Sequence, residues 1–410
     1  MFLVKYNETV NICFETFGCR LNKSETLDDE AKCLAKGHSI VDSHAEADMI
    51  VIRGCSVTAR AQSDCEKLIA HIRAKYPAKR IFITGCLANA KKLEISDVHR
   101  SSDTPADSIP IPRRTARAYL KVQDGCSCSC AFCIVPKFRG TPVSVPFQEI
   151  MDKARRFIDA GYHEIVVTGC NLMLYSSEGH DIADLAAALA SLSPDCRIRL
   201  GSVEPGARAF ELVHAMAEHE NICRFLHMSV QSGSDTVLKA MKRPYLAKDV
   251  DALALEATKL MPLVCLGCDL IAGFPGETNT DFMLTKGLLI RHHFANVHAF
   301  PFSERPGTLA ATMMNRVLPD LRRQRAKALG DMGVECRRQF AKKFVAKNVE
   351  VVVENGNKLS GWTSEYLWLE ASRIPAQFKA RIMSGFSPRR KILTFKVRSA
   401  HMGTLYGEPI

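Results

Sequence analysis

Short apolar segments that alternate with helical segments constrain the fold of this chain more than any other feature. Near the amino end, residues 10–17, 49–53 and 81–84 are rich in β-branched and aromatic side chains, and a helical pattern covers residues 59–74. Strands that alternate with helices form parallel sheets that helices cover. Residues 1–105 are therefore predicted to form a doubly wound α/β domain.

Each of these three predicted strands runs into a glycine–cysteine pair. The cysteines are Cys19, Cys55 and Cys86, and each directly follows a glycine. The loops after the strands of a parallel sheet share one edge, where ligands bind. We therefore expect these three cysteines to meet in space, although they are far apart in the chain.

The same alternation continues over residues 112–343, after a polar stretch with three prolines at residues 101–114 that is predicted to be a linker. The candidate strands are spaced like successive βα units, and they lie at residues 118–122, 164–168, 197–203, 225–230, 266–272 and 296–302. Six such units predict an open, partial (β/α)6 barrel. Its functional groups should lie at the carboxyl ends of the strands.

The tail at residues 344–410 contains strand patterns without long helices, which predicts a small antiparallel barrel of the oligonucleotide-binding kind. It has 10 basic and 5 acidic residues, in a chain whose formal net charge is +11. Together with a basic helix predicted at residues 321–343, this charge favours a polyanionic partner such as RNA. Two alternatives, base stacking or a place in the core of the tail, remain open for Trp362, Tyr366 and Trp368.

The chain has 16 cysteines. It shows neither the pattern of a signal peptide nor an apolar run of about 18 residues, the length that a membrane helix needs. We therefore expect a cytoplasmic protein, in which thiols are more often ligands, catalysts or buried side chains than disulfides. Cysteines without companions in the sequence are predicted to be core residues: Cys13, Cys33, Cys65, Cys196, Cys223, Cys265, Cys268 and Cys336.

One group of cysteines directly follows the first strand of the second block. Cys126, Cys130 and Cys133 have the spacing C-x3-C-x2-C. A structural zinc site needs four ligands, and no second pair lies nearby. Three thiolates on one loop instead suit a 4Fe–4S cluster with one open iron that can hold a small chelating ligand. Cys128 is predicted to be a non-ligand, and Cys170 is predicted to fill space.

This loop, at the end of the first strand of a partial barrel, resembles that of the radical S-adenosylmethionine (SAM) superfamily. Within it, the methylthiotransferases are similar at residues 121–126, 133–140, 197–205, 227–235, 273–278 and 305–308. The resemblance covers nearly the whole chain. It implies that Cys19, Cys55 and Cys86 hold a second 4Fe–4S cluster and that the tail is a TRAM domain that binds RNA.

The resemblance also implies an activity. Members replace the hydrogen at C2 of an adenine in the tRNA anticodon loop by a methylthio group. SAM on the open iron yields a 5′-deoxyadenosyl radical, and the second cluster presents sulfur. A reducing electron donor and a sulfur source are implied as partners, and no membrane. The most similar branch acts on N6-threonylcarbamoyladenosine. Alternatives are the branches for isopentenyl-adenosine or a ribosomal-protein aspartate, or a non-enzymatic iron–sulfur protein that binds RNA or carries electrons.

Polar residues at the ends of the barrel strands are our candidates for contacts with SAM. They are Gly169, Asn171, Ser202, Glu204 and Gln231, although strand ends also need polar caps and glycine turns. Glu204 could accept hydrogen bonds from the amino group or the ribose of SAM. No catalytic side chain is expected beyond the cluster ligands. His227 and His298 are predicted to be hydrogen-bonded core histidines.

Overall fold

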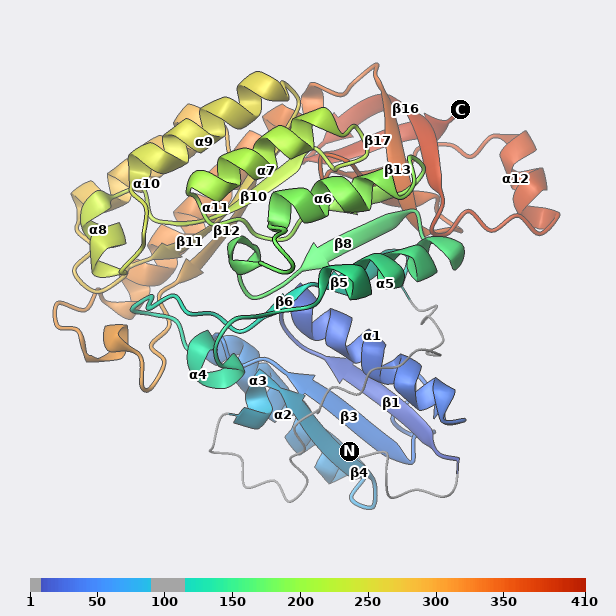
Figure 1. The fold of residues 1–410 in the computed structure, drawn as a ribbon, viewed down its shortest axis with the longest axis horizontal. Helices are drawn as coiled ribbons and strands as arrows, with labels where there is room; N and C mark the ends of the chain where they lie inside the picture. The colour runs from blue at the N-terminus through green and yellow to red at the C-terminus, as the bar shows by residue number, and fades with distance from the viewer. Residues whose placement is uncertain (1–8, 90–114) are drawn as a thin grey trace.

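The computed structural model describes residues 9–89 and 115–410, which form three units. Figure 1 shows the amino-terminal unit below the strands of the middle unit, with the carboxyl-terminal barrel at one end. The predicted linker at residues 101–114 lies outside the described residues. In the described part of the chain, no helix is long and apolar enough to span a membrane.

The amino-terminal unit is a parallel sheet with strand order β2-β1-β3-β4. Ile50 of β3 shares a hydrophobic cluster with Ile69 of α2, whereas the next residue, Val51, shares another with Cys33 of α1. Helices therefore cover both faces, and the doubly wound α/β fold is confirmed. The elements are β1 Asn11–Thr16, α1 Arg20–Ala35, β2 Ser39–Ile40, β3 Met49–Gly54, α2 Ala59–Lys75, β4 Arg80–Gly85 and α3 Cys86–Asn89.

The middle unit contains the six predicted strands, arranged as two parallel sheets of three. One sheet has β5 Ala118–Lys121, β8 Glu164–Thr168 and β9 Arg197–Arg199, and the other has β10 Phe225–Gln231, β11 Cys265–Ala272 and β12 Asn296–Pro301. A bridge between Val203 and Met228 joins them. The partial barrel is confirmed, but its third strand ends at Arg199, because the chain then leaves the ladder and pairs again only at Val203.

Helices of the middle unit pack on one side of these strands and bury the largest hydrophobic cluster of the molecule. The long helices are α5 Phe147–Asp159, α6 Ile182–Ser191, α7 Ala207–Glu218, α9 Ala247–Leu260, α10 Asn279–His292 and α11 Pro319–Lys342. The short elements are β6 Gln123–Asp124, α4 Val135–Arg139, β7 Val143–Ser144, η2 Leu172–Leu174, α8 Asp235–Ala240 and η3 Leu309–Thr312. Each fully buried Leu or Ile in this cluster contributes about 1.5–3 kcal/mol to folding.

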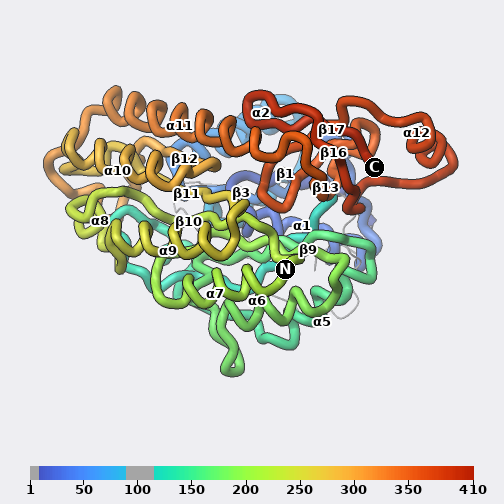
Figure 2. Tube along the Cα trace, turned by 90° about the horizontal axis from the view of Figure 1, so that it is seen from above, coloured from blue at the N-terminus to red at the C-terminus, as the bar shows by residue number. Residues whose placement is uncertain are grey.

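The tail forms a closed five-stranded barrel with the order β13-β14-β15-β17-β16, as predicted except that β15 and β17 are parallel. Its elements are β13 Asn348–Asn355, β14 Ser360–Thr363, β15 Trp368–Ala371, α12 Ala376–Met383, β16 Ile392–His401 and β17 Thr404–Pro409. Figures 1 and 2 both place α12 at the opposite end of the molecule from α8.

A buried carboxylate joins the tail to the middle unit. Glu164 of β8 has no exposed side-chain surface and pairs with Arg197 and Arg199, at 2.7 and 2.8 Å. The same arginines donate to the carbonyl oxygens of Trp362 and Thr363, at 3.0 and 2.8 Å. These contacts satisfy charges that would otherwise be costly to bury.

Two of the three tail residues considered for base stacking, Trp362 and Tyr366, pack at this same junction. The ring of Tyr366 stacks on Trp362 with centroids 4.4 Å apart and on Phe225 of β10 with centroids 4.6 Å apart. Trp368 meets the edge of Trp362 at 5.0 Å. Protein rings therefore occupy the stacking surfaces of Tyr366, which favours packing over the base-stacking alternative.

The basic helix predicted at residues 321–343 is α11, but two of its arginines do not face solvent. Arg322 and Arg325 are buried, and they pair with Glu304 and Glu277 at 3.1 and 2.6 Å. Arg323, by contrast, is exposed. Part of the positive charge of the helix thus stabilises the middle unit and is not available to a partner.

Candidate functional site

The glycine–cysteine pairs of the amino-terminal unit meet at the carboxyl edge of its sheet. A Cβ atom on Gly18 would lie 2.5 Å from the Cβ atom of Cys55 and 2.8 Å from its sulfur, so the first pair packs directly on the second. Gly18 also has a φ of 93°, which disfavours other residues. Burial raises the pKa of the Cys55 thiol to about 11, and the nearby thiols of Cys19 and Cys86 add to the increase.

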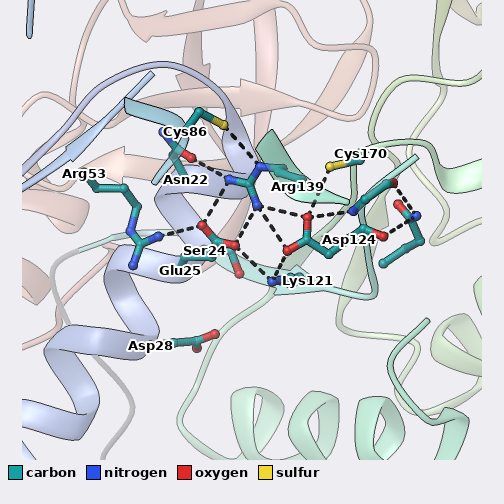
Figure 3. A network of polar contacts seen from close by, with 12 residues as sticks. Asn22, Ser24, Glu25, Asp28, Arg53, Cys86, Lys121, Asp124, Arg139 and Cys170 are labelled. Carbon is teal, nitrogen blue, oxygen red and sulfur yellow. Dashed lines mark hydrogen bonds and ion pairs between the residues drawn. The ribbon is translucent and has the colours of Figure 1, made fainter. Parts of the chain in front are cut away.

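Arg139, the last residue of α4 in the middle unit, brings a cation to this edge, as Figure 3 shows. Its Nε atom donates to the sulfur of Cys86 over 3.3 Å. Its Nη1 atom donates to Oε1 of Glu25 over 2.9 Å and to Oδ1 of Asp124 over 3.0 Å. Asp124 lies just before Cys126 in the chain. One side chain therefore connects the two groups of cysteines.

The carboxylates in this network are held by several cations. Lys121 contacts Glu25 at 2.9 Å and Asp124 at 2.7 Å, and Arg53 contacts Glu25 at 2.7 Å. Burial alone would raise the pKa of both carboxyl groups, but Arg139 and Lys121 outweigh it and lower each pKa to about 2. Both carboxylates are therefore charged at neutral pH, and Glu25 of the first unit joins it to Lys121 and Arg139 of the middle unit.

The second group of cysteines lies on an irregular loop that begins at Gly125. This glycine has a φ of 68°, and a Cβ atom there would lie 2.0 Å from the carbonyl oxygen of Thr141. The backbone N–H of Cys128 donates to the sulfur of Cys126 over 3.4 Å. Only glycine allows the turn that starts this loop.

Arg243 connects the cysteine loop to Glu204, which also lies next to Asn171, another candidate for a contact with SAM. Its Nη1 atom donates to the sulfur of Cys130 over 2.9 Å, and its Nη2 atom donates to Oε2 of Glu204 over 2.7 Å. The side-chain amide of Asn171 approaches the same carboxylate oxygen at 3.5 Å. Asn171 and Glu204, which the sequence placed at the ends of two different strands, thus lie together beside Cys130.

The other candidates make no hydrogen bond with Arg243 or Glu204 in the described part of the chain. Ser202 is exposed and Gln231 is half-buried, and neither side chain makes a hydrogen bond with another described residue. Gly169 lies against Gln123, since a Cβ atom on it would be 3.1 Å from the Cβ atom of that residue. Their contact with SAM stays a prediction.

Several single-residue predictions need correction. Cys170 does more than fill space, because its thiol lies 3.3 Å from Oδ1 of Asp124. Cys336 is half-buried rather than a core residue. The side chain of His298 is 48% exposed and therefore does not belong to the core.

Sequence reasoning gave no role to Arg139 or Arg243. Arg139 follows the cysteine loop within one of the resembling motifs, which was a usable signal. Nothing local to Arg243 indicates its partners.

The donor sets fit iron–sulfur clusters. Cys126, Cys130 and Cys133 are half-buried free thiols on one loop, and each group of three cysteines has a guanidinium beside it. Thiolates are the usual ligands of such clusters, and hydrogen bonds to sulfur tune their potentials. The carboxylate and amide beside Cys130 fit a ligand that carries both ammonium and hydroxyl donors.

Two family models match the chain. Residues 120–289 match the radical SAM superfamily, and residues 11–105 match the uncharacterized protein family UPF0004.

Among curated proteins, the threonylcarbamoyladenosine tRNA methylthiotransferase MtaB of Thermotoga maritima is 31% identical over 88% of this chain and 90% of that protein. The tRNA-2-methylthio-N(6)-dimethylallyladenosine synthase of Cereibacter sphaeroides is also 31% identical, over 87% of this chain and 90% of that protein.

Among solved structures, the radical SAM methyltransferase TsrM from Kitasatospora setae superposes with a TM-score of 0.53, over 74% of this chain and 77% of that one. At 11% sequence identity, this is a similarity of fold.

Proposed function

The chain belongs to the radical SAM methylthiotransferase family, and we propose that it methylthiolates N6-threonylcarbamoyladenosine next to the anticodon of tRNA. It is thus an enzyme of tRNA modification, and the non-enzymatic alternative loses its support. The relative named for threonylcarbamoyladenosine and the relative named for dimethylallyladenosine are equally similar to the chain. The choice of threonylcarbamoyladenosine rests on residues 16–22 and 118–126, which are most similar to the branch of the family that acts on this nucleoside.

We propose two 4Fe–4S clusters, one on Cys126, Cys130 and Cys133 and the other on Cys19, Cys55 and Cys86. When bound, these clusters and SAM supply the radical that removes the hydrogen from C2 of the adenine and the sulfur that replaces it. The contacts of Arg139 support this assignment best, because they tie Cys86 to the loop that begins after Asp124.

The side chains beside the cysteine loop have separate tasks in this proposal. Glu204 accepts a hydrogen bond from the ammonium or ribose of SAM, and Asn171 donates or accepts beside it. Arg243 keeps Glu204 ionised and oriented through its 2.7 Å contact. The exposed cations of the tail bind phosphates of the RNA, a contribution that weakens as salt concentration rises.

Analysis of tRNA nucleosides by mass spectrometry tests the substrate. In cells that lack the gene, the methylthio derivative of N6-threonylcarbamoyladenosine should vanish while its precursor accumulates. Loss of the methylthio derivative of isopentenyl-adenosine instead would overturn the proposed substrate. Unchanged tRNA together with loss of a methylthio-aspartate in ribosomal protein would move the activity to a protein.

Serine variants test the proposed ligands in the purified, reconstituted enzyme. The wild-type chain should hold about eight irons, in two four-iron clusters. Cys130→Ser should lose about four irons and the reductive cleavage of SAM, whereas Cys55→Ser should lose about four irons but keep cleavage without forming product. Cys265→Ser, at a buried cysteine of β11, is the matched control that should keep all eight. Full iron content in Cys130→Ser or Cys55→Ser would contradict the assignment.

A further inference from the structure

The sheet of β10, β11 and β12 has two faces with different surroundings. Leu266, Leu270 and Val297 point into the large cluster beneath the helices. Residues one position along these strands, among them Asp269, His298 and Phe300, lie on the other face, because side chains alternate across a strand. This second face forms the inside of the partial barrel. The carboxylate of Asp269 and the imidazole of His298 are unusual side chains there.

Two of these inward residues are well exposed. Phe300 is 45% exposed, and the side chain of His298 is 48% exposed. Asp269 and His227 are more covered, with 24% and 6% of their side chains exposed. A large aromatic ring beside polar groups in an open position is typical of a ligand site.

Contacts on either side of Phe300 show where this face lies relative to the two cysteine groups. Across the sheet, Phe300 pairs with Ile271 of β11, which packs on a cluster that includes Ala131, between Cys130 and Cys133. Beyond β12, the hydroxyl of Ser303 accepts from the backbone N–H of Ala59, at the start of α2. The exposed ring thus lies between the elements that carry the two proposed clusters.

Two imidazole N–H groups hold the carboxylate of Asp269 in place next to Phe300. Oδ1 of Asp269 accepts from Nε2 of His227 at 3.1 Å and from Nδ1 of His298 at 3.2 Å. Gly267 makes this possible, because a Cβ atom there would lie 2.5 Å from Nδ1 of His227. In the described part of the chain, Oδ2 of Asp269 makes no hydrogen bond or ion pair. Nε2 of His298 has only the amide of Asn296, at 3.5 Å.

The geometry points to this face as the site that receives the target adenine, with Phe300 stacked on the base and Asp269 and His298 on its polar edge. This inference rests on the proposed function. An adenine edge offers an N–H donor at N6 beside a ring-nitrogen acceptor. Oδ2 of Asp269 can accept from N6–H, which one N6 substituent leaves in place, and His298 then lies beside the ring nitrogen. Base–aromatic stacking then supplies affinity that does not depend on sequence.

Binding of an anticodon stem-loop to the reconstituted holoenzyme tests the stacking contact. Two RNAs are compared, one with the target nucleoside and one with an abasic site at that position. For the wild-type enzyme, the abasic site should weaken binding about tenfold. For Phe300→Ala, the two RNAs should bind within about twofold of each other, whereas Phe300→Trp should keep the difference. Leu255→Ala, an exposed apolar side chain on α9, is the matched control.

A second comparison tests the polar edge. In Asp269→Asn, the N–H groups of the two histidines should hold the side-chain amide oxygen in the place of Oδ1. The amide NH2 group should then take the place of Oδ2, where it faces N6–H of the base and repels it. Removal of the N6 group from the target base should therefore weaken binding to the wild-type enzyme but not to Asp269→Asn.

An equal abasic penalty in the wild-type enzyme and Phe300→Ala would overturn the inference. A second result would also overturn it: the wild-type enzyme binds one Zn²⁺ or Co²⁺ per chain in addition to the cluster iron, and Asp269→Asn does not. The side chains would then be metal ligands. Failure of the proposed function is distinguishable, since the wild-type enzyme itself would then form no methylthio nucleoside on the stem-loop.

Discussion

The Nε atom of Arg139 lies 3.3 Å from the sulfur of Cys86, although 53 positions separate the two residues in the chain. The arginine belongs to the middle unit and the cysteine to the first. The contact therefore depends on the way the two units pack, and it places a positive charge next to a proposed cluster ligand. A guanidinium there offsets the negative charge that three thiolates concentrate.

Replacement of Arg139 by methionine should destabilise the junction of the first two units. Glu25 and Asp124 would keep their burial but lose their main cation, and removal of one partner from such a buried network costs about 3–5 kcal/mol. We expect a lower temperature of unfolding and a first-unit cluster with a shifted reduction potential, measured by calorimetry and by redox titration followed with electron paramagnetic resonance.

A lysine at another contact between the units provides the comparison for Arg139. Lys153 contacts Asp28 at 2.8 Å, but about a third of each side chain is exposed. Lys153→Met should therefore cost less than about 1 kcal/mol. Equal losses of stability in Arg139→Met and Lys153→Met would show that the network around Arg139 has no special role.

Gly125 and Gly140 form a matched pair near the cysteine loop. Both have positive φ values, of 68° and 77°, but only at Gly125 would a Cβ atom collide with backbone, whereas Gly140 has open space around it. Gly125→Ala should displace the loop and remove about four irons. Gly140→Ala should keep its iron and cost backbone strain of about 1–3 kcal/mol, because the φ of 77° and ψ of −160° at this position favour glycine. Iron analysis and thermal unfolding measure both, and full iron in Gly125→Ala would refute the prediction.

Arg243 should affect SAM binding through Glu204. In Arg243→Met, the carboxylate loses the 2.7 Å contact that orients it, and Cys130 loses a donor. We expect the affinity for SAM to fall about tenfold, the usual size of a charge-assisted contact. Equilibrium dialysis with labelled SAM measures this change, and Arg243→Lys should recover part of it. Unchanged affinity in Arg243→Met would place SAM elsewhere.

The free energy of unfolding should depend on pH, because the buried Glu164 stabilises the fold only when it is ionised. Burial alone would raise its pKa, but Arg199 and Arg197 lower the pKa in the folded protein well below the usual value near 4.5. Because the folded pKa is the lower one, the stabilisation is fully present above about pH 4.5 and is lost as the pH falls. Glu164→Gln should be about 3–5 kcal/mol less stable at pH 7.

Thermal unfolding between pH 7 and pH 3.5 tests this behaviour. The difference between the wild-type chain and Glu164→Gln should shrink as the solution becomes more acidic. A difference that stays constant over this range would mean that folding does not change the pKa of Glu164.

The fold was largely predictable because local patterns define it. Short segments rich in β-branched and aromatic residues, with helical segments between them, indicated the parallel sheets, and strands without long helices between them marked the tail. The convergence of the first three cysteines was also predictable, since strand ends of a parallel sheet share an edge. The parallel pairing of β15 with β17 was not, because it depends on how the chain closes the barrel.

The sequence by itself determined which residues carry the chemistry and at which strand ends they lie, because strand periodicity and motif spacing are local properties. Only the tertiary structure decided that Arg139 reaches Cys86, that Arg243 joins Glu204 to Cys130, and that Phe300 is exposed on the inner face of β12. These relationships arise when units distant in the chain pack together. Side-chain contacts across such junctions depend on orientation and burial, which no local pattern specifies.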